Sequence, residues 1–205
     1  IRFYFIKSFN YDAHMFTFKK KYFFIIESTR DIDLKKIKKS KKFSIIYRSK
    51  KIPENIEKIM KFRRNCKTKN IDFYVSNNIK LTNILKADGI YISAYNKNLK
   101  FARLKSFNLR IIGAAHNSKE INVKKLQGCS DIIFSRLFST SYKYKKGFHG
   151  VVKFNLFSLS RKEDLIPMGG IKLDNLNKVN TVRCSSIALS SEIVKNPKIF
   201  SSRCF

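Results

Sequence analysis

The chain has 205 residues, and its 44 lysines and arginines against 14 aspartates and glutamates give a formal net charge of +30. No apolar run approaches the roughly 20 residues that a membrane-spanning helix needs, so no membrane partner is expected. The length is enough for one well-filled core, although it is short of the roughly 250 residues typical of an eight-unit α/β barrel. We therefore expect one compact domain.

The positive charge would ordinarily indicate nucleic acid, an anionic membrane or phosphorylated ligands. Here it accompanies a general excess of Lys, Asn, Ile and Phe, which an AT-rich coding sequence would produce regardless of function. The basic residues are spread along the chain in short runs, and no arginine-rich arm or stacked-aromatic signature of an RNA-binding sheet is present. A basic nucleic-acid-binding protein is therefore kept only as a second alternative.

The cysteines show no C-x-x-C pair, and the three histidines lie far apart without the spacing of a zinc site. We expect a reduced, cytoplasmic setting in which the thiols are buried or inert. The four cysteines are Cys66, Cys129, Cys184 and Cys204.

In chain order, residues 1–14 carry aromatic side chains without a clear period, and Met15 stands just before the first convincing strand. We expect residues 1–14 to be a non-native or disordered extension and residues 15–205 to form a single domain. Apolar runs of four to six residues then recur eight times: Tyr22–Ile26, Phe43–Tyr47, Ile71–Val75, Gly89–Ile92, Leu109–Gly113, Asp131–Phe134, Leu165–Met168 and Ser186–Leu189.

Most of these runs are separated by amphipathic helical patterns. The segment Ile52–Lys69 has Pro53 in its first turn, and Ile56, Ile59 and Met60 share one face. The spacing recurs at Leu81, Ile84 and Leu85 and, more weakly, at Ile121, Val123 and Leu126. Continuous apolar strands alternating with helices indicate parallel strands covered by helices. Eight units favour a compact (β/α)8 TIM barrel over an open doubly wound sheet of six or seven strands.

The last two predicted strands end in small residues. The run Leu165–Met168 is followed by Gly169 and Gly170, and Ser186–Leu189 is followed by Ser190 and Ser191. Bare amides and hydroxyls at this place are typical of the phosphate pocket that the last two units of a parallel barrel build. The same residues could form an ordinary turn and a helix cap. We expect the four residues to converge on one phosphate.

In a barrel, the functional residues lie where the strands end. These ends carry cations, hydroxyls and amides: Arg48-Ser49-Lys50, Ser76-Asn77-Asn78, Ser93–Asn96, Ala114–Asn117 and Ser135–Thr140, with Lys143 beyond. Such a ring suits phosphate. It contains no carboxylate, so it lacks the oxygen anions that hold Mg²⁺ and any obvious general acid/base pair.

Five segments, in this order, resemble motifs of the thiamine phosphate synthase and thiazole tautomerase (TenI-like) family of compact (β/α)8 barrels. Lys86–Ile92 resembles "GADGVHL", Ile112–Asn117 "IG-S-HS", Ser130–Thr140 "ADYIGFGPVFPT", Met168–Ile171 "IGGI" and Ile187–Ile193 "VAVVSAI". The resemblance runs from about Tyr22 to Ile193. It implies thiamine biosynthesis, in which the synthase joins a pyrimidine diphosphate to thiazole phosphate and releases pyrophosphate.

The resemblance also implies two sets of binding residues. The pyrophosphate and pyrimidine would contact Arg48, Lys50, Ser76 and Lys143, and the thiazole phosphate would contact Thr140, Gly169, Gly170, Ser190 and Ser191. The implied partners are thus phosphorylated small molecules, and the sequence leaves open whether the chain is a monomer or a homo-oligomer.

Several positions depart from the family pattern. Asn77 and Asn96 stand where the resemblance places the two aspartates that bind Mg²⁺, and neutral amides bind this ion far less well. Ile46 replaces a glutamine of the pyrophosphate motif, and Arg136 replaces the tautomerase histidine. Mg²⁺-dependent catalysis is therefore in doubt. The first alternative is a barrel that has lost its metal and serves as a phosphate-ligand-binding or regulatory protein.

Overall fold

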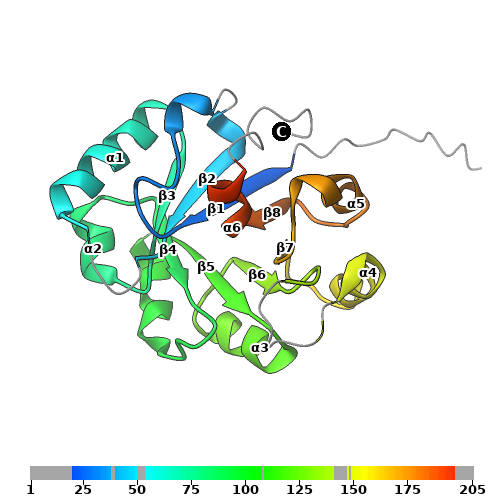
Figure 1. Ribbon diagram of the computed structural model, residues 1–205. Helices are drawn as coiled ribbons and strands as arrows, with labels where there is room; N and C mark the ends of the chain where they lie inside the picture. Colours follow the sequence, from blue (N-terminus) through cyan, green and yellow to red (C-terminus); the bar gives the residue numbers. More distant parts are fainter. Residues whose placement is uncertain are drawn as a thin grey trace, which may run out of the picture.

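The computed structural model describes residues 20–37, 40–49, 54–107, 109–140, 147 and 149–196. Within these ranges eight parallel strands close into a barrel in chain order, and β8 pairs with β1 (Figure 1). The strands are β1 Lys21–Ile26, β2 Phe43–Tyr47, β3 Asp72–Ser76, β4 Gly89–Ile92, β5 Arg110–Ala115, β6 Asp131–Ser135, β7 Leu165–Met168 and β8 Ser186–Leu189. The predicted compact (β/α)8 barrel is confirmed. The expected extension, residues 1–14, lies outside the described residues.

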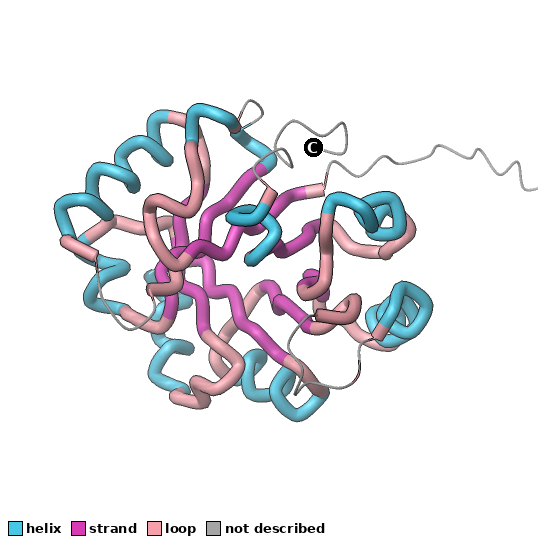
Figure 2. The backbone as a smooth tube through the Cα atoms, viewed as in Figure 1, coloured by secondary structure: helices cyan, strands magenta, loops and turns pink. Residues whose placement is uncertain are grey.

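Helices surround the barrel (Figure 2). They are α1 Ile56–Thr68, α2 Ile79–Ile84, α3 Ser118–Leu126, α4 Gly150–Leu159, α5 Leu176–Asn180 and α6 Ser191–Lys195, with 3₁₀ segments at Leu34–Lys36, Ser40–Lys42, Leu99–Phe107 and Leu173–Asn175. The connection from β4 to β5 contains the 3₁₀ segment Leu99–Phe107, whereas each of the other described connections between β2 and β8 contains an α-helix. None of the helices in the described ranges is long and apolar enough to cross a membrane.

The side chains of each strand divide between two cores, because alternate residues of a strand point to opposite faces. In β1, Phe24 and Ile26 pack outward in the cluster that includes Phe62 of α1. Phe23 and Ile25 point inward and belong to a second cluster, called here the axis cluster. Each of the other strands contributes to it: Ile46, Tyr74, Tyr91, Ile112, Ile133, Ile166 and Ala188. The barrel axis is therefore filled by side chains, and a ligand site must lie at a mouth.

The helices bury faces that the apolar pattern alone does not identify. The buried face of α1 consists of Ile59, Phe62, Arg63 and Cys66. Ile56 and Met60, predicted to share the face of Ile59, are 47% and 38% exposed. Arg63 is buried in their place because its guanidinium donates to Asp88 at 2.8 Å. The predicted face of α1 is thus wrong except at Ile59.

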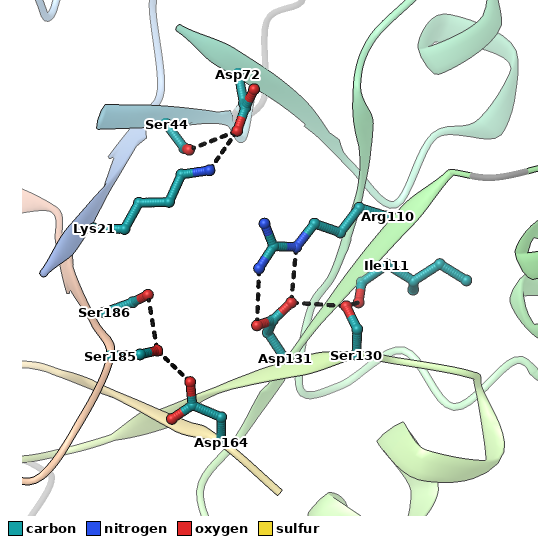
Figure 3. A network of polar contacts seen from close by, with 10 residues as sticks. All are labelled: Lys21, Ser44, Asp72, Arg110, Ile111, Ser130, Asp131, Asp164, Ser185 and Ser186. Atoms are coloured by element: carbon teal, nitrogen blue, oxygen red, sulfur yellow. Dashed lines mark hydrogen bonds and ion pairs between the residues drawn. The ribbon is translucent and has the colours of Figure 1, made fainter. Parts of the chain in front are cut away.

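A layer of polar residues closes the end of the barrel where the strands begin (Figure 3). Its members stand two residues before members of the axis cluster and therefore face inward: Lys21, Ser44, Asp72, Arg110, Asp131, Asp164 and Ser186. Arg110 donates to both carboxylate oxygens of Asp131, at 2.9 and 3.0 Å. This hydrogen bonding raises the pKa of Arg110. Lys21 pairs with Asp72, which also accepts from Ser44. We call this set the polar layer.

The described cysteines are free thiols within the packed core or beside it. Burial raises the pKa of Cys66 and of Cys129 to about 12, and that of Cys184 to about 11. Because the thiolate is the reactive form, these three thiols are inert at neutral pH. This agrees with the sequence-based expectation, while Cys204 lies outside the described residues.

Candidate functional site

The opposite mouth, where the strands end, is lined by half-buried polar side chains. The inward-facing positions two residues after the axis cluster hold one carboxylate, one cation and several hydroxyls: Glu27, Arg48, Ser76, Ser93, Ser135 and Ser190. All come from different strands or from the residue that directly follows one. Because parallel strands bring their carboxyl ends to the same mouth, these groups share one rim.

Arg48 lies at the rim with a carboxylate beside it. Its Nη2 is 3.4 Å from Oε1 of Glu27, at the end of β1. Arg48 stands two residues after Ile46 of the axis cluster and therefore faces the barrel axis. Burial raises the pKa of Tyr91 in the same cluster, and the positive charge of Arg48 opposes that shift. Lys50 and Lys143, predicted to act with Arg48, lie outside the described residues.

A cavity of about 500 Å³ opens beyond β6, β7 and β8. It brings together Thr140, Gly170 and Ser191, three of the five residues that the resemblance assigns to the thiazole phosphate. The other two, Gly169 and Ser190, are their chain neighbours and are not among its lining residues. The remaining lining residues are Ser139, Ile171, Lys172, Leu173, Asp174, Glu192, Lys195 and Asn196. We call this cavity the β7–β8 pocket.

The backbone at Gly170 is possible only for glycine. Its φ is +67°, a left-handed conformation that residues with a Cβ rarely adopt. A Cβ there would lie 2.7 Å from the carbonyl oxygen of Phe138 and closer still to that of Ser139. The loop after β7 therefore packs directly on the loop after β6, which sets the shape of the β7–β8 pocket.

Thr140 is held in the pocket wall by Arg136. Nη1 of Arg136 donates to Oγ1 of Thr140 at 3.0 Å, and Nη2 donates to the carbonyl oxygen of Gly147 at 3.0 Å. Because the threonine oxygen accepts from Arg136, its own O–H can donate to an anion in the pocket. Arg136 thus stabilises the loop at the position that the resemblance gives to a tautomerase histidine.

The expectation that no carboxylate stands at the strand ends is wrong, because Glu27 directly follows β1 and contacts Arg48. Asp174 and Glu192 line the β7–β8 pocket together with Lys172 and Lys195. Glu192 is buried and accepts from the Leu173 N–H at 3.2 Å and from the Asn196 side chain at 2.7 Å. The sequence contained a signal for Glu192, since this residue directly follows Ser190 and Ser191, but only residues up to Ser191 were assigned to the phosphate site.

Asn77 and Asn96 lie in direct contact across the ends of β3 and β4. Oδ1 of Asn77 accepts from Nδ2 of Asn96 at 3.1 Å and from the Ser93 N–H at 3.0 Å. Nδ2 of Asn77 donates to the hydroxyls of Ser93 at 3.0 Å and of Ser76 at 3.3 Å. We call Asn77 and Asn96 the amide pair.

The profile of the family described as thiamine monophosphate synthase matches residues 30–193. The chain belongs to this family. The thiamine-phosphate synthase of Dictyoglomus turgidum is 29% identical over 161 residues, which are 76% of this chain and 72% of that protein. That of Prochlorococcus marinus strain SARG is 27% identical over 153 residues, which are 73% of this chain but only 44% of the relative. The chain thus spans less than half of that protein.

The solved structure of a thiamine phosphate pyrophosphorylase from Pyrococcus furiosus has the same fold. It superposes with a TM-score of 0.67 at 17% identity, covering 89% of this chain and 96% of that one. The native KDPGal structure superposes with a TM-score of 0.59 at 11% identity. The resemblance to thiamine phosphate synthase and thiazole tautomerase is thereby confirmed for the family as a whole.

The thiamine monophosphate synthase fold implies a metal site that the amide pair does not fit. The oxygen of Asn77 already accepts two hydrogen bonds, and one of them comes from Asn96. Mg²⁺ prefers anionic oxygens in octahedral geometry, and no group of three or more His, Cys, Asp or Glu side chains able to hold a metal occurs in the described part of the chain.

Restoring the two carboxylates should create some affinity for Mg²⁺. We expect Asn77→Asp/Asn96→Asp to bind Mg²⁺ about tenfold or more tightly than the unchanged protein, because each amide becomes an anionic oxygen ligand. Isothermal titration with Mg²⁺ alone measures this. Asn65→Asp/Asn180→Asp, at exposed positions near the C-terminal ends of α1 and α5, adds the same charge at the opposite end of the barrel. An equal gain in both double variants would mean that the amide pair is not the metal position.

Proposed function

We propose that this chain is a cytoplasmic thiamine phosphate synthase. The observation that carries the proposal is the β7–β8 pocket, in which the Thr140 hydroxyl, the Gly170 backbone and Ser191 meet beside two lysines. Hydroxyls, bare amides and cations together are the donors that phosphate binding requires. The relatives named thiamine-phosphate synthase support the same assignment.

In the proposed reaction, the C–O bond between the pyrimidine carbon and its diphosphate breaks, and both electrons leave with pyrophosphate. The nitrogen lone pair of thiazole phosphate then forms a C–N bond to the resulting cation. No proton has to be removed before the new bond forms, so the reaction requires no general acid/base pair at the mouth. The residues of the chain then act by positioning both substrates and stabilising the leaving charge.

The two ends of the mouth would divide these tasks. Arg48, near the barrel axis, would contact the leaving pyrophosphate, which would compete with Glu27 for the guanidinium. Thr140, Gly170 and Ser191 would hold the phosphate of the thiazole. Both phosphorylated substrates would thus enter through the same mouth, since the axis cluster and the polar layer fill the rest of the barrel.

The direct test is incubation with the pyrimidine diphosphate and thiazole phosphate, with and without Mg²⁺, while pyrophosphate release is followed. Release that needs both substrates and yields thiamine phosphate would support the proposal. Binding of either substrate without any release, under both conditions, would contradict it and support the first alternative, a phosphate-ligand-binding or regulatory barrel. The contact within the amide pair favours that alternative.

A matched set of lysine variants separates a defined site from a diffuse positive surface. We expect Lys50→Gln and Lys143→Gln to weaken pyrophosphate binding about ten- to a hundredfold each, the usual effect of losing one charge-assisted contact. Lys58→Gln, on the exposed face of α1, should leave binding unchanged. Titration with pyrophosphate gives all three affinities. Equal small losses in the three variants would indicate a diffuse surface and exclude the synthase-like site.

A further inference from the structure

Lys124 on α3 is a fully buried lysine beneath the rim of the mouth. Its side chain is completely shielded from solvent, although the apolar pattern of α3 placed Val123 and Leu126 on the buried face. Leu126 is instead 66% exposed. α3 therefore buries a lysine against the barrel where an apolar side chain was expected. The free-energy cost of burying this amine must be offset by hydrogen bonds.

Three oxygen atoms surround the amine of Lys124. Nζ donates to the carbonyl oxygens of Ser93 and Asn96, both at 2.7 Å, and to Oε1 of Gln127 at 2.8 Å. An ammonium has three N–H donors, whereas a neutral amine has two and a lone pair that would face one of these oxygens. Burial lowers the pKa of Lys124, but three acceptors at these distances favour the charged form.

Gln127 completes the arrangement and fixes its direction. Its Nε2 donates to the carbonyl oxygens of Asn96 and Asn98, both at 2.9 Å, so its Oε1 must be the atom that faces Lys124. Lys124 and Gln127 thus make four hydrogen bonds to the backbone of residues 93–98, the segment that follows β4. The side chain of Asn96 in this segment contacts Asn77. The segment and the amide pair are therefore held from below by a buried cation.

We infer that Lys124 positions the amide pair and supplies a fixed positive charge beside it. This part of the mouth therefore excludes Mg²⁺ and suits an anionic oxygen ligand such as a diphosphate. Exclusion of the metal follows from the charges of this chain alone. Only the diphosphate rests on the proposed function. Two aspartates and Mg²⁺ without an ammonium beside them would carry no net charge, whereas the two amides and the ammonium of Lys124 carry one positive charge without any metal.

The expected size of the effect follows from electrostatics. A divalent cation bound by the amide pair would be repelled by the buried ammonium, which donates to the backbone carbonyl oxygen of Asn96 itself. Even for charges on the order of 10 Å apart, this repulsion lowers the affinity for Mg²⁺ several-fold with the dielectric constant of bulk water and more than about a hundredfold at an effective value near 20. A neutral side chain at this position would give no such effect on a metal ion.

The test compares Mg²⁺ binding in variants that differ only in the buried charge. The background is Asn77→Asp/Asn96→Asp, which supplies carboxylates, and Lys124 is then replaced by methionine or by arginine. We expect Lys124→Met to increase Mg²⁺ affinity at least about tenfold over the background, and Lys124→Arg to leave it unchanged because the charge remains. Equal affinities in the folded methionine variant and the background would overturn the inference, as would a gain with arginine.

The unchanged protein provides a test that does not depend on folding of the variants. Its affinity for Mg²⁺ alone should be weaker than about 1 mM, and tighter binding would overturn the inference whatever the variants do. Pyrophosphate should bind equally well in the presence of EDTA and of Mg²⁺, and a tenfold gain with Mg²⁺ would also overturn it. If pyrophosphate binds under neither condition, the proposed function fails while the Mg²⁺ comparison still decides the role of Lys124.

Discussion

Replacing Gly170 by alanine is expected to reduce the free energy of unfolding by roughly 2 to 5 kcal/mol and to abolish phosphate binding in the β7–β8 pocket. Two costs add. A left-handed φ of +67° penalises any Cβ, and the new methyl group would overlap the carbonyl groups of Phe138 and Ser139. Because both are backbone atoms of the loop after β6, relief requires that loop to move, and Thr140 in the pocket wall would move with it. Chemical denaturation and a phosphate titration measure the two effects.

Gly150 provides a matched control for this prediction. It has the same φ of +67°, but a Cβ there would meet nothing within 4 Å. Gly150→Ala therefore carries the conformational cost alone, about 1 to 2 kcal/mol, and should leave the pocket intact. If both alanine variants lose the same stability, the loops after β6 and β7 are not in contact and the shape assigned to the pocket is wrong.

Replacing Asp131 by asparagine is expected to cost about 2 to 4 kcal/mol. Asp131 is 9% exposed, accepts from Arg110 through both oxygens and also accepts from the Ser130 hydroxyl at 2.7 Å. The asparagine would leave Arg110 without a counter-charge inside the polar layer and would present an amide N–H to its guanidinium. Since the Arg110 side chain is 39% exposed, water recovers part of the loss, which keeps the estimate below that of a fully buried pair. Denaturation in urea at neutral pH gives the value.

Asp72 in the same polar layer is the appropriate comparison. It pairs with Lys21, but its side chain is 40% exposed. Asp72→Asn should therefore cost about 1 kcal/mol or less. Similar losses at Asp72 and Asp131 would mean that burial does not set the strength of these pairs, contrary to the argument for Asp131.

The strands were predictable because a parallel barrel buries both faces of each strand, which leaves continuous apolar runs such as Phe43–Tyr47 in the sequence. Helix faces were harder. On α3 and at its C-cap the buried side chains include Lys124 and Gln127, which an apolar pattern predicts to be exposed, while Leu126 faces solvent. Their burial depends on carbonyl oxygens of the segment after β4, far away in the sequence, and no local pattern reports such partners.

The candidate site shows the same division. Thr140, Gly170 and Ser191 could be grouped in advance, since the ends of parallel strands meet at one mouth. The resemblance assigned Asn77 and Asn96 to one metal position, and in the structure their side chains are hydrogen-bonded to each other. Glu192 escaped notice because it belongs to the helix after the strand rather than to the strand end. The polar layer was missed because Asp72, Asp131 and Ser186 were counted within predicted apolar runs. Lys21 and Asp164 stand just before such runs, so no single run shows that these residues meet at one end of the barrel.

The polar layer also determines how this protein responds to its ionic surroundings. Three of only 14 acidic residues are committed to it, and others, such as Asp31, Glu54 and Asp88, accept hydrogen bonds from backbone N–H groups. Few carboxylates are left to balance the cations on the surface. The excess cations that give the net charge of +30 therefore repel one another in the folded chain. Dissolved anions relieve that repulsion, whereas they weaken the partly buried Arg110–Asp131 pair less. We therefore expect the folded protein to be less stable in dilute buffer than in moderate salt.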